Sequence, residues 1–301
     1  MIIAHINGLS REPSLSYRNN VKPLWNRVNL GAYTLLFGCG KLVAKKKNLV
    51  LAVSGKGGVG KTTVTTLIVK VLSESGRRSM LVIDANPDSN LPDVLGISVS
   101  KTVGMVANEL KKSVERAEIP PEMTKKDILE ARVFGVLKET PNFDLLVMGR
   151  TEGEGCYCLV NNLLTHIIDT ISKNYDLTIM DMEAGLEHLS RRTDRDVDIM
   201  IVVTDPSFMG LQTAKRIKEL AREVHIQFKK IYLIGNRFAP EMETTLREEA
   251  KKIGVEFAGI VPHDDYILKN NLAGQPLLNL SNESPALTAV TDILKQIGLL
   301  D

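Results

Sequence analysis

GKGGVGKTT occupies residues 55–63, directly behind an apolar run at residues 48–54. The string fits the phosphate-loop pattern G-x-x-x-x-G-K-[ST], which ends here at Gly60, Lys61 and Thr62. Glycines are needed because such a loop wraps its backbone N–H groups around phosphate oxygens, where side chains would obstruct the approach. A strand before the loop and an amphipathic helix after it are the context that the motif requires, and both patterns are present. The sequence therefore predicts a nucleotide site.

The residue types of this loop predict how ATP and Mg²⁺ are held. Lys61 reaches the outer phosphates, and the Thr62 hydroxyl helps to hold Mg²⁺. The helix that follows points the positive end of its dipole at the anion. The predicted nucleotide-binding residues of the loop are Gly55, Lys56, Gly57, Gly58, Val59, Gly60, Lys61, Thr62 and Thr63.

Bulk properties exclude several classes of protein. The chain has 301 residues with a formal net charge of +2, so nothing in its charge favours nucleic acid as a partner. Its 3 cysteines are too few for a disulfide framework and suit a reducing compartment, which predicts a cytoplasmic protein. No apolar run approaches the roughly 18 residues that a membrane helix needs.

The first 42 residues do not resemble the rest of the chain. They carry scattered Arg, Asn and Pro before an apolar stretch that ends at Cys39, a pattern that loosely resembles a signal peptide or a lipoprotein cleavage site. We favour the hypothesis that residues 1–42 are a dispensable extension or the product of a start site placed too far upstream. Residues 43–301 are then a single P-loop ATPase domain, which would begin naturally at Val43.

From residue 48 onward, short apolar segments alternate with helical patterns. This alternation predicts an α/β fold, a doubly wound, mostly parallel sheet with helices on both faces. We expect strands at residues 49–53, 79–83, 143–148, 177–180, 199–204, 230–235 and 256–260. We expect helices at residues 62–75, 158–173, 208–224, 241–252 and 285–297, with further surface helices inserted over residues 92–140.

Two aspartates follow predicted strands and are candidate Mg²⁺ ligands. Asp84 ends the second strand in DANPDSNL, and Asp181 ends another strand in DMEAGLEHL. Carboxylates at the carboxyl ends of buried parallel strands lie on the same edge as the phosphate loop, where they can hold Mg²⁺ directly or through water. A lone aspartate at a strand end is more often a helix cap or turn residue, but two beside a phosphate loop favour the metal.

Lys56, just after the first glycine, gives the loop its deviant form. The string GKGGVGKTT resembles the SIMIBI ATPases related to MinD, ParA, nitrogenase iron protein and ArsA. In that family the equivalent lysine crosses a dimer interface to the partner's nucleotide, so the resemblance implies a homodimer when ATP is bound. It also implies that residues 84–91 and 181–189 are the first and second switches.

The first switch departs from the family pattern. Most relatives carry D-x-D there, and the second Asp orients the attacking water, whereas this chain has Asn86. An amide holds water by hydrogen bonds but cannot take a proton, so we expect slow hydrolysis, with Asp88 as an alternative water-positioning residue. The catalytic residues implied by the resemblance are Lys56, Lys61, Asn86 and Asp181.

The adenine end of the site is implied by the same resemblance. Relatives place an Asn at the end of the strand that corresponds to residues 230–235, and Asn236 with Arg237 nearby matches it. Residues 261–263 resemble the loop that covers the other side of the base, which would bring His263 near it. An Asn at a strand end is also a common turn residue, so both interpretations stand.

Cys156 and Cys158 form a Cys-x-Cys pair in MGRTEGEGCYCLVNNLL. Thiolates are ligands for zinc and nickel, and residues two apart in an extended segment point the same way. Because the pair supplies only two ligands, a two-fold axis that brings two chains around one ion completes a tetrahedral site. By spacing alone, a redox pair or plain packing residues fit equally well.

The wider context of the pair resembles one branch of these ATPases. LLVMGRTEGEGCYC, VNNLL and DMEAGLEHL resemble the CooC-type accessory ATPases that insert nickel into carbon monoxide dehydrogenase, and their acetyl-CoA synthase counterparts. The resemblance implies that Cys156 and Cys158 bind Ni²⁺ or Zn²⁺ at a dimer interface, and that the client is a nickel enzyme. His166 and His188 are nearby in sequence but are weak candidates as ligands.

Two other functions fit parts of the pattern. An electron-transfer ATPase like nitrogenase iron protein would hold a bridging [4Fe–4S] cluster with four thiolates, although those relatives use separated cysteines rather than Cys-x-Cys. A positioning ATPase like MinD or ParA would bind a membrane or DNA. MinD-like proteins end in a basic amphipathic helix, whereas residues 286–300 contain a single lysine.

The first-switch departure yields a prediction about turnover. Replacing Asn86 by Asp restores the family's second carboxylate, and we expect the rate of ATP hydrolysis to rise, since loss of a general base costs about 10²–10⁴-fold. Steady-state phosphate release from wild type and Asn86→Asp measures this. Equal turnover in the two proteins would contradict the prediction.

Overall fold

The computed structural model describes residues 48–116, 118–119, 124–150, 168–183, 197–223 and 228–301. All of them lie in one compact unit, Lys46–Asp301. Cys156, Cys158, His166, His188 and most of the second switch lie outside the described residues, as does the extension at residues 1–42. In the described part of the chain, no helix has the length and apolarity that crossing a membrane requires.

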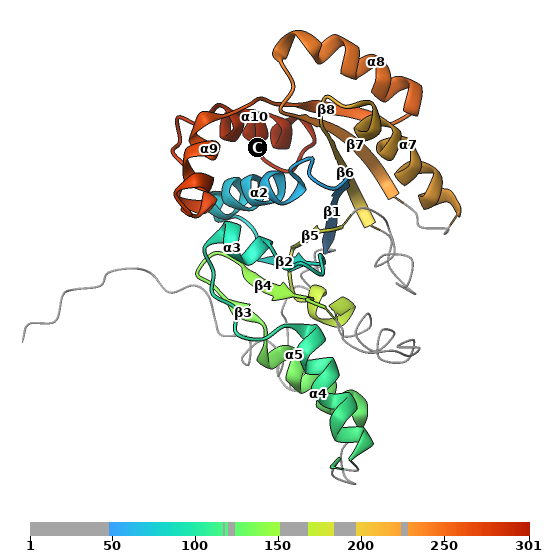
Figure 1. The fold of residues 1–301 in the computed structure, drawn as a ribbon, viewed down its shortest axis with the longest axis vertical. Helices are drawn as coiled ribbons and strands as arrows, with labels where there is room; N and C mark the ends of the chain where they lie inside the picture. The colour runs from blue at the N-terminus through green and yellow to red at the C-terminus, as the bar shows by residue number, and fades with distance from the viewer. Residues whose placement is uncertain (1–47, 117, 120–123, 151–167, 184–196, 224–227) are drawn as a thin grey trace, which may run out of the picture. The chain divides into compact units, whose positions relative to one another are not determined.

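An 8-stranded sheet with the order β3-β4-β2-β5-β1-β6-β7-β8 forms the centre of this unit (Figure 1). Every pairing is parallel except that of β3 with β4. The strands are β1 (Leu49–Gly55), β2 (Met80–Asp84), β3 (Lys138–Glu139), β4 (Asp144–Val147), β5 (Leu177–Asp181), β6 (Val197–Thr204), β7 (Phe228–Asn236) and β8 (Glu256–Val261). The predicted α/β fold with a mostly parallel sheet is confirmed.

The helices lie on both faces of the sheet. Figure 1 shows α2 and α10 on one side and α7 and α8 on the other. Because both faces are covered, β2, β5 and β6 are buried along their whole length, which explains why they read as continuous apolar runs. The bounds of these helices are α2 (Lys61–Ser75), α7 (Phe208–Glu223), α8 (Glu243–Ile253) and α10 (Pro285–Gln296). A further helix, α9 (Asp265–Leu272), contacts the 3-10 turn η3 (Leu277–Asn279), and a second 3-10 turn, η2 (Pro240–Met242), precedes α8.

The predicted insertion at residues 92–140 is correct in part. It contains α4 (Val103–Glu115) and α5 (Lys125–Gly135), which contact each other. A short helix, α3 (Leu91–Leu95), precedes them and is not a surface element, because Leu91 and Leu95 are fully buried in the main core. The segment also ends in the antiparallel strand β3, which two exposed charged residues made invisible to a search for apolar runs.

One further element, the helix α9, was not predicted, and the remaining differences concern the ends of elements. Strands β6 and β7, for example, begin two residues earlier than expected. Residues 168–172 are helical and belong to the predicted helix 158–173. Residue 173 is in a turn, and residues 158–167 lie outside the described residues.

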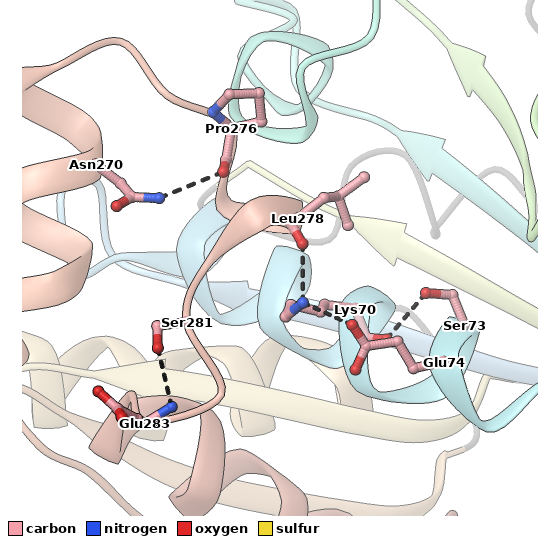
Figure 2. A network of polar contacts seen from close by, with 8 residues as sticks. All are labelled: Lys70, Ser73, Glu74, Asn270, Pro276, Leu278, Ser281 and Glu283. Atoms are coloured by element: carbon pink, nitrogen blue, oxygen red, sulfur yellow. Dashed lines mark hydrogen bonds and ion pairs between the residues drawn. The ribbon is translucent and has the colours of Figure 1, made fainter.

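A buried lysine joins α2 to the C-terminal segment. The Lys70 ammonium donates to the carbonyl oxygen of Leu278 in η3 at 2.8 Å and to the Glu74 carboxylate at 2.6 Å (Figure 2). The Lys70 side chain is only 7% exposed, while that of Glu74 is 53% exposed. The interaction therefore fixes η3 against the helix that begins at the phosphate loop.

Lys70→Met tests how much this junction stabilises the fold. Methionine keeps the apolar stem but leaves the Leu278 carbonyl without its donor, so we expect the free energy of unfolding to fall by about 1–3 kcal/mol. The matched control is Lys215→Met, which removes a similarly spaced Lys–Glu pair between two exposed side chains on α7. Because exposed pairs contribute about 0–1 kcal/mol, the control should change little in urea denaturation. Equal losses in both variants would contradict this role of Lys70.

Candidate nucleotide-binding site

The phosphate loop connects β1 to α2 and is pressed against neighbouring strands. Gly55 has a φ of 152°, and a Cβ there would overlap the carbonyl oxygen of Val203 in β6. Gly60 has a φ of 91°, and a Cβ there would overlap the side-chain amide of Asn236 at the end of β7. Glycine is therefore required at both ends of the loop by this chain's own packing.

The middle of the loop differs, because added side chains would meet nothing there. A Cβ built on Gly57 or Gly58 has no described atom of the protein within 4 Å. Gly58 also adopts a positive φ of 82°. Open space around glycine backbone is the arrangement that lets N–H groups approach a phosphate closely. The loop thus fits the polyphosphate that its sequence predicts.

Lys61, the first residue of α2, folds back across the loop. Its ammonium donates to the Lys56 carbonyl oxygen at 3.1 Å, and its side chain is largely buried. Burial lowers the pKa of Lys61, while the carboxylates of Asp181 and Glu183 oppose that shift. A buried cation at the start of a helix gives the site a positive charge that solvent does not screen. Lys56 itself is partly buried and directly follows Gly55, the first glycine of the loop.

Asp181 ends β5 and binds α2 through two hydroxyl groups. Thr62 donates to one carboxylate oxygen at 2.7 Å, and Thr65, one helical turn later, donates to the other at 3.1 Å. Burial raises the pKa of Asp181, and these two hydrogen bonds together with the Lys61 charge counter the rise. The predicted pair of Thr62 and Asp181 is in contact. Thr65 was missed, although its position three residues after Thr62 places it on the same helix face.

Asp84 lies opposite Asp181 in the register of β2 and β5. Its carboxylate is fully buried and accepts the backbone N–H groups of Asn86 at 3.0 Å and Leu91 at 3.1 Å. Burial raises the pKa of Asp84 to about 7; the two N–H donors oppose the rise, and the charge of Asp181 adds to it. Two buried carboxylates side by side favour a bound cation, because it relieves both desolvation and mutual repulsion.

These residues fit Mg²⁺ by the chemistry of their oxygen atoms. Carboxylates and a threonine hydroxyl are ligands that Mg²⁺ prefers, alongside phosphate oxygens and water. Among the described residues, no cluster of three or more His, Cys, Asp or Glu side chains could hold a metal ion.

Residues 84–91, the predicted first switch, are linked by hydrogen bonds within the segment. The side-chain oxygen of Asn86 accepts the N–H of Asp88 at 3.1 Å, and its backbone carbonyl accepts the N–H of Ser89 at 3.0 Å. Asn86 therefore shapes the switch turn with its oxygen. Asp88 is exposed and forms an ion pair with Arg150, three residues after β4. Sequence reasoning gave no sign of this ion pair.

Asn236 and Arg237 contact the phosphate loop itself. The side-chain amide of Asn236 donates to the Val59 carbonyl at 2.7 Å, and the Arg237 guanidinium donates to the Gly58 carbonyl at 2.8 Å. Neither contact was expected from the sequence, which gave these residues to the adenine base. His263, also expected near the base, has an exposed side chain 3.8 Å from the carboxylate of Asp265. Contact of these three residues with adenine stays a prediction.

The raised pKa of Asp84 predicts how the free energy of unfolding depends on pH. Above about pH 4 the unfolded chain releases this proton, whereas the folded protein keeps it up to about pH 7. Because the folded state binds more protons between about pH 4 and pH 7, the free energy of unfolding falls as pH rises through this range. Above about pH 7 the stabilisation that protonated Asp84 gives is lost. Asp84→Asn cannot ionise, so we expect wild type to lose stability relative to the variant by at most about 1.4 kcal/mol per pH unit. Urea denaturation in EDTA without nucleotide measures this, and a difference that does not vary with pH would contradict it.

Comparison with known proteins places this site in a family. The model of the CobQ/CobB/MinD/ParA nucleotide binding domain matches residues 50–277. An uncharacterized ATP-binding protein of Methanocaldococcus jannaschii is 52% identical over 249 residues, covering 83% of this chain and 98% of the relative. The carbon monoxide dehydrogenase accessory protein CooC of Rhodospirillum rubrum is 32% identical over 265 residues, covering 82% of this chain and 97% of the relative.

Solved structures agree on the fold. A ParA family ATPase from Chlorobium tepidum superimposes with a TM-score of 0.62 at 22% identity, covering 82% of this chain and 98% of that one. The MinD cell division protein of Aquifex aeolicus gives a TM-score of 0.59 at 22% identity, with 83% and 96% covered. With the phosphate loop, buried lysine and paired carboxylates in place, the chain belongs to the CobQ/CobB/MinD/ParA nucleotide-binding family and is a P-loop ATPase.

Proposed function

We propose that this protein is an ATP-dependent metallochaperone that carries Ni²⁺ or Zn²⁺ and assists nickel insertion into a client enzyme. The client is carbon monoxide dehydrogenase or acetyl-CoA synthase, and the site of action is the cytoplasm. The observation that carries the proposal is the Cys-x-Cys pair, Cys156 and Cys158, in a P-loop ATPase. The 32% identity to a carbon monoxide dehydrogenase accessory protein, over most of both chains, supports it.

The described residues have distinct parts in ATP hydrolysis. The open glycine backbone at residues 57 and 58 receives the phosphates, and the Lys61 ammonium lies beside it to stabilise charge on the outer phosphate oxygens. Thr62, Asp84 and Asp181 would hold Mg²⁺, which neutralises charge on the β- and γ-phosphates when it is bound. Because positioning and charge stabilisation dominate phosphoryl transfer, this set is sufficient for catalysis without a strong base.

The first switch supports a slow reaction. The side-chain oxygen of Asn86 is used by the N–H of Asp88, so its amide N–H groups are the part left to orient a water molecule. An N–H donor fixes the position of water but accepts no proton. Asp88, the alternative, points its carboxylate at Arg150. Neither residue is arranged as a general base in this conformation, and slow turnover suits a protein that must hold its cargo until it meets a client.

Dimer formation is the step that would join ATP to the metal. Two cysteines per chain supply half of a tetrahedral thiolate site, and a second chain related by a two-fold axis would complete it. Lys56 matches the lysine that reaches the partner's nucleotide in related ATPases, so ATP and metal would both favour the same pairing of chains. A dimer interface with two arrangements is then the two-state element on which both sites act.

The position of α10 argues against a MinD-like membrane role. Five of its residues, Ala286, Leu287, Val290, Ile293 and Leu294, are buried, and the helix packs on α2 and β8. An amphipathic membrane anchor needs its apolar face free to enter the lipid surface. The apolar face of α10 is instead part of the hydrophobic core.

Metal analysis tests the cargo. We expect anaerobically purified protein to carry about half a nickel or zinc per chain without sulfide, since one four-coordinate ion shared by two chains is the arrangement that two cysteines per chain permit. Cys156→Ser should lose the metal. Cys39→Ser is the matched control, because Cys39 is the third cysteine of the chain and lies in the N-terminal extension.

Two outcomes would contradict the proposal. About two irons and two sulfides per chain would mean a bridging [4Fe–4S] cluster and an electron-transfer ATPase. Metal that remains in Cys156→Ser and disappears in Cys39→Ser would place the ion elsewhere in the chain.

A further inference from the structure

The end of β7 holds the phosphate loop by its carbonyl groups. Asn236 and Arg237 are consecutive residues, and they donate to the consecutive carbonyls of Val59 and Gly58 at 2.7 and 2.8 Å. Lys61 donates to a third carbonyl of the same loop, that of Lys56. Three of the loop's acceptors are thus occupied by side chains of the protein.

Occupied carbonyls determine where the loop's N–H groups point. A trans peptide unit is planar, so the carbonyl of one residue and the N–H of the next are directed to opposite sides. Holding the carbonyls of Gly58 and Val59 toward β7 therefore turns the N–H groups of Val59 and Gly60 away from β7. In this structure the N–H of Val59 donates to the Lys56 carbonyl within the loop at 3.5 Å.

The backbone at Arg237 is in a conformation that arginine adopts at a cost. Its φ is 62°, in the left-handed region that favours glycine. Its own N–H donates to the Val261 carbonyl in β8 at 2.8 Å, so two strands fix this turn while the exposed side chain reaches the loop. Strained residues of this kind concentrate at functional sites.

Asn236 also packs directly against Gly60 of the loop. Its side chain is buried against Gly60, where the absence of a Cβ makes room for the amide nitrogen. Glycine is thus needed at residue 60 for two reasons: it lets Asn236 approach the loop closely, and it adopts a positive φ. The arrangement is a direct contact between the end of β7 and the loop.

We propose that Asn236 and Arg237 are positioning residues of the ATPase, which hold the Gly58 and Val59 carbonyls and so direct the loop's N–H groups toward the polyphosphate. Their action is on phosphate binding through the loop, in addition to any contact with the base. The proposal concerns the nucleotide site of the ATPase and does not depend on the metal cargo.

A probe without a base separates the two roles. Affinities for Mg²⁺–ATP and for Mg²⁺–tripolyphosphate are measured by calorimetry on the full chain, wild type and Arg237→Gly. Glycine removes the guanidinium and relieves the positive φ, so the melting temperature should stay equal or rise. We expect both affinities to fall by the same factor, about 3- to 10-fold, as for the loss of one hydrogen bond.

Arg77→Gly is the matched control, because Arg77 is an exposed arginine beyond the opposite end of α2. It should leave both affinities unchanged. Asn236→Asp puts an acceptor oxygen in place of the amide that faces the Val59 carbonyl, and it should weaken both ligands more strongly than Arg237→Gly does.

Several results would overturn the proposal. Weaker ATP binding with unchanged tripolyphosphate binding in Arg237→Gly would assign the residue to the base. Unchanged binding of both ligands would remove it from the site, and a lower melting temperature together with weaker binding would make its role one of general stability. A wild-type protein that does not bind tripolyphosphate would show that the loop alone is no phosphate cradle.

Discussion

The carboxylate of Asp181 binds the helix of the phosphate loop to the neighbouring strand, and the rest of the site depends on where it holds that helix. Its two oxygens accept hydroxyl groups one helical turn apart on α2. The backbone carbonyl of Asp181 accepts the N–H of Ala85, and this bond also fixes the start of residues 84–91, the predicted first switch. A buried carboxylate is costly unless its charge is compensated, so the same group that fixes the helix also favours a bound cation.

The strand order divides the site between the two sides of β1. On one side, β5 and β2 bring Asp181 and Asp84 together as neighbours in register. On the other side, β6 leaves room only for a glycine at residue 55, and β7 supplies the two donors that hold the loop's carbonyls. The phosphate loop is therefore held from one side by the Asp181 carboxylate, which accepts hydroxyl groups of its helix, and from the other by the side chains of Asn236 and Arg237, which donate to its backbone carbonyls. Both sets come from strand ends, as expected of a parallel sheet that binds ligands at its carboxyl edge.

Much of this arrangement was predictable from local sequence. Local patterns predict the phosphate loop, both aspartates and every parallel strand, because glycine spacing and apolar runs are properties of neighbouring residues. Strand β3 was missed because two exposed residues beside a neighbouring strand leave no apolar pattern, and α3 was misplaced because burial of Leu91 and Leu95 is decided by tertiary packing. The contacts of Asn236 and Arg237 join residues about 177 and 179 positions apart, and no local pattern encodes such a pairing.

We propose that one dimer interface serves both the ATP site and the thiolate pair. The most direct test is to titrate nickel into the protein against a chromophoric chelator, with Mg²⁺–ADP or a non-hydrolysable ATP analogue present. Because allosteric coupling is reciprocal and amounts to about 5- to 150-fold, we expect nickel affinity with the analogue to differ from that with Mg²⁺–ADP within that range. Nickel should then change the ratio of the protein's affinities for the analogue and for ADP by the same factor. Equal nickel affinity in both nucleotide states would contradict the account.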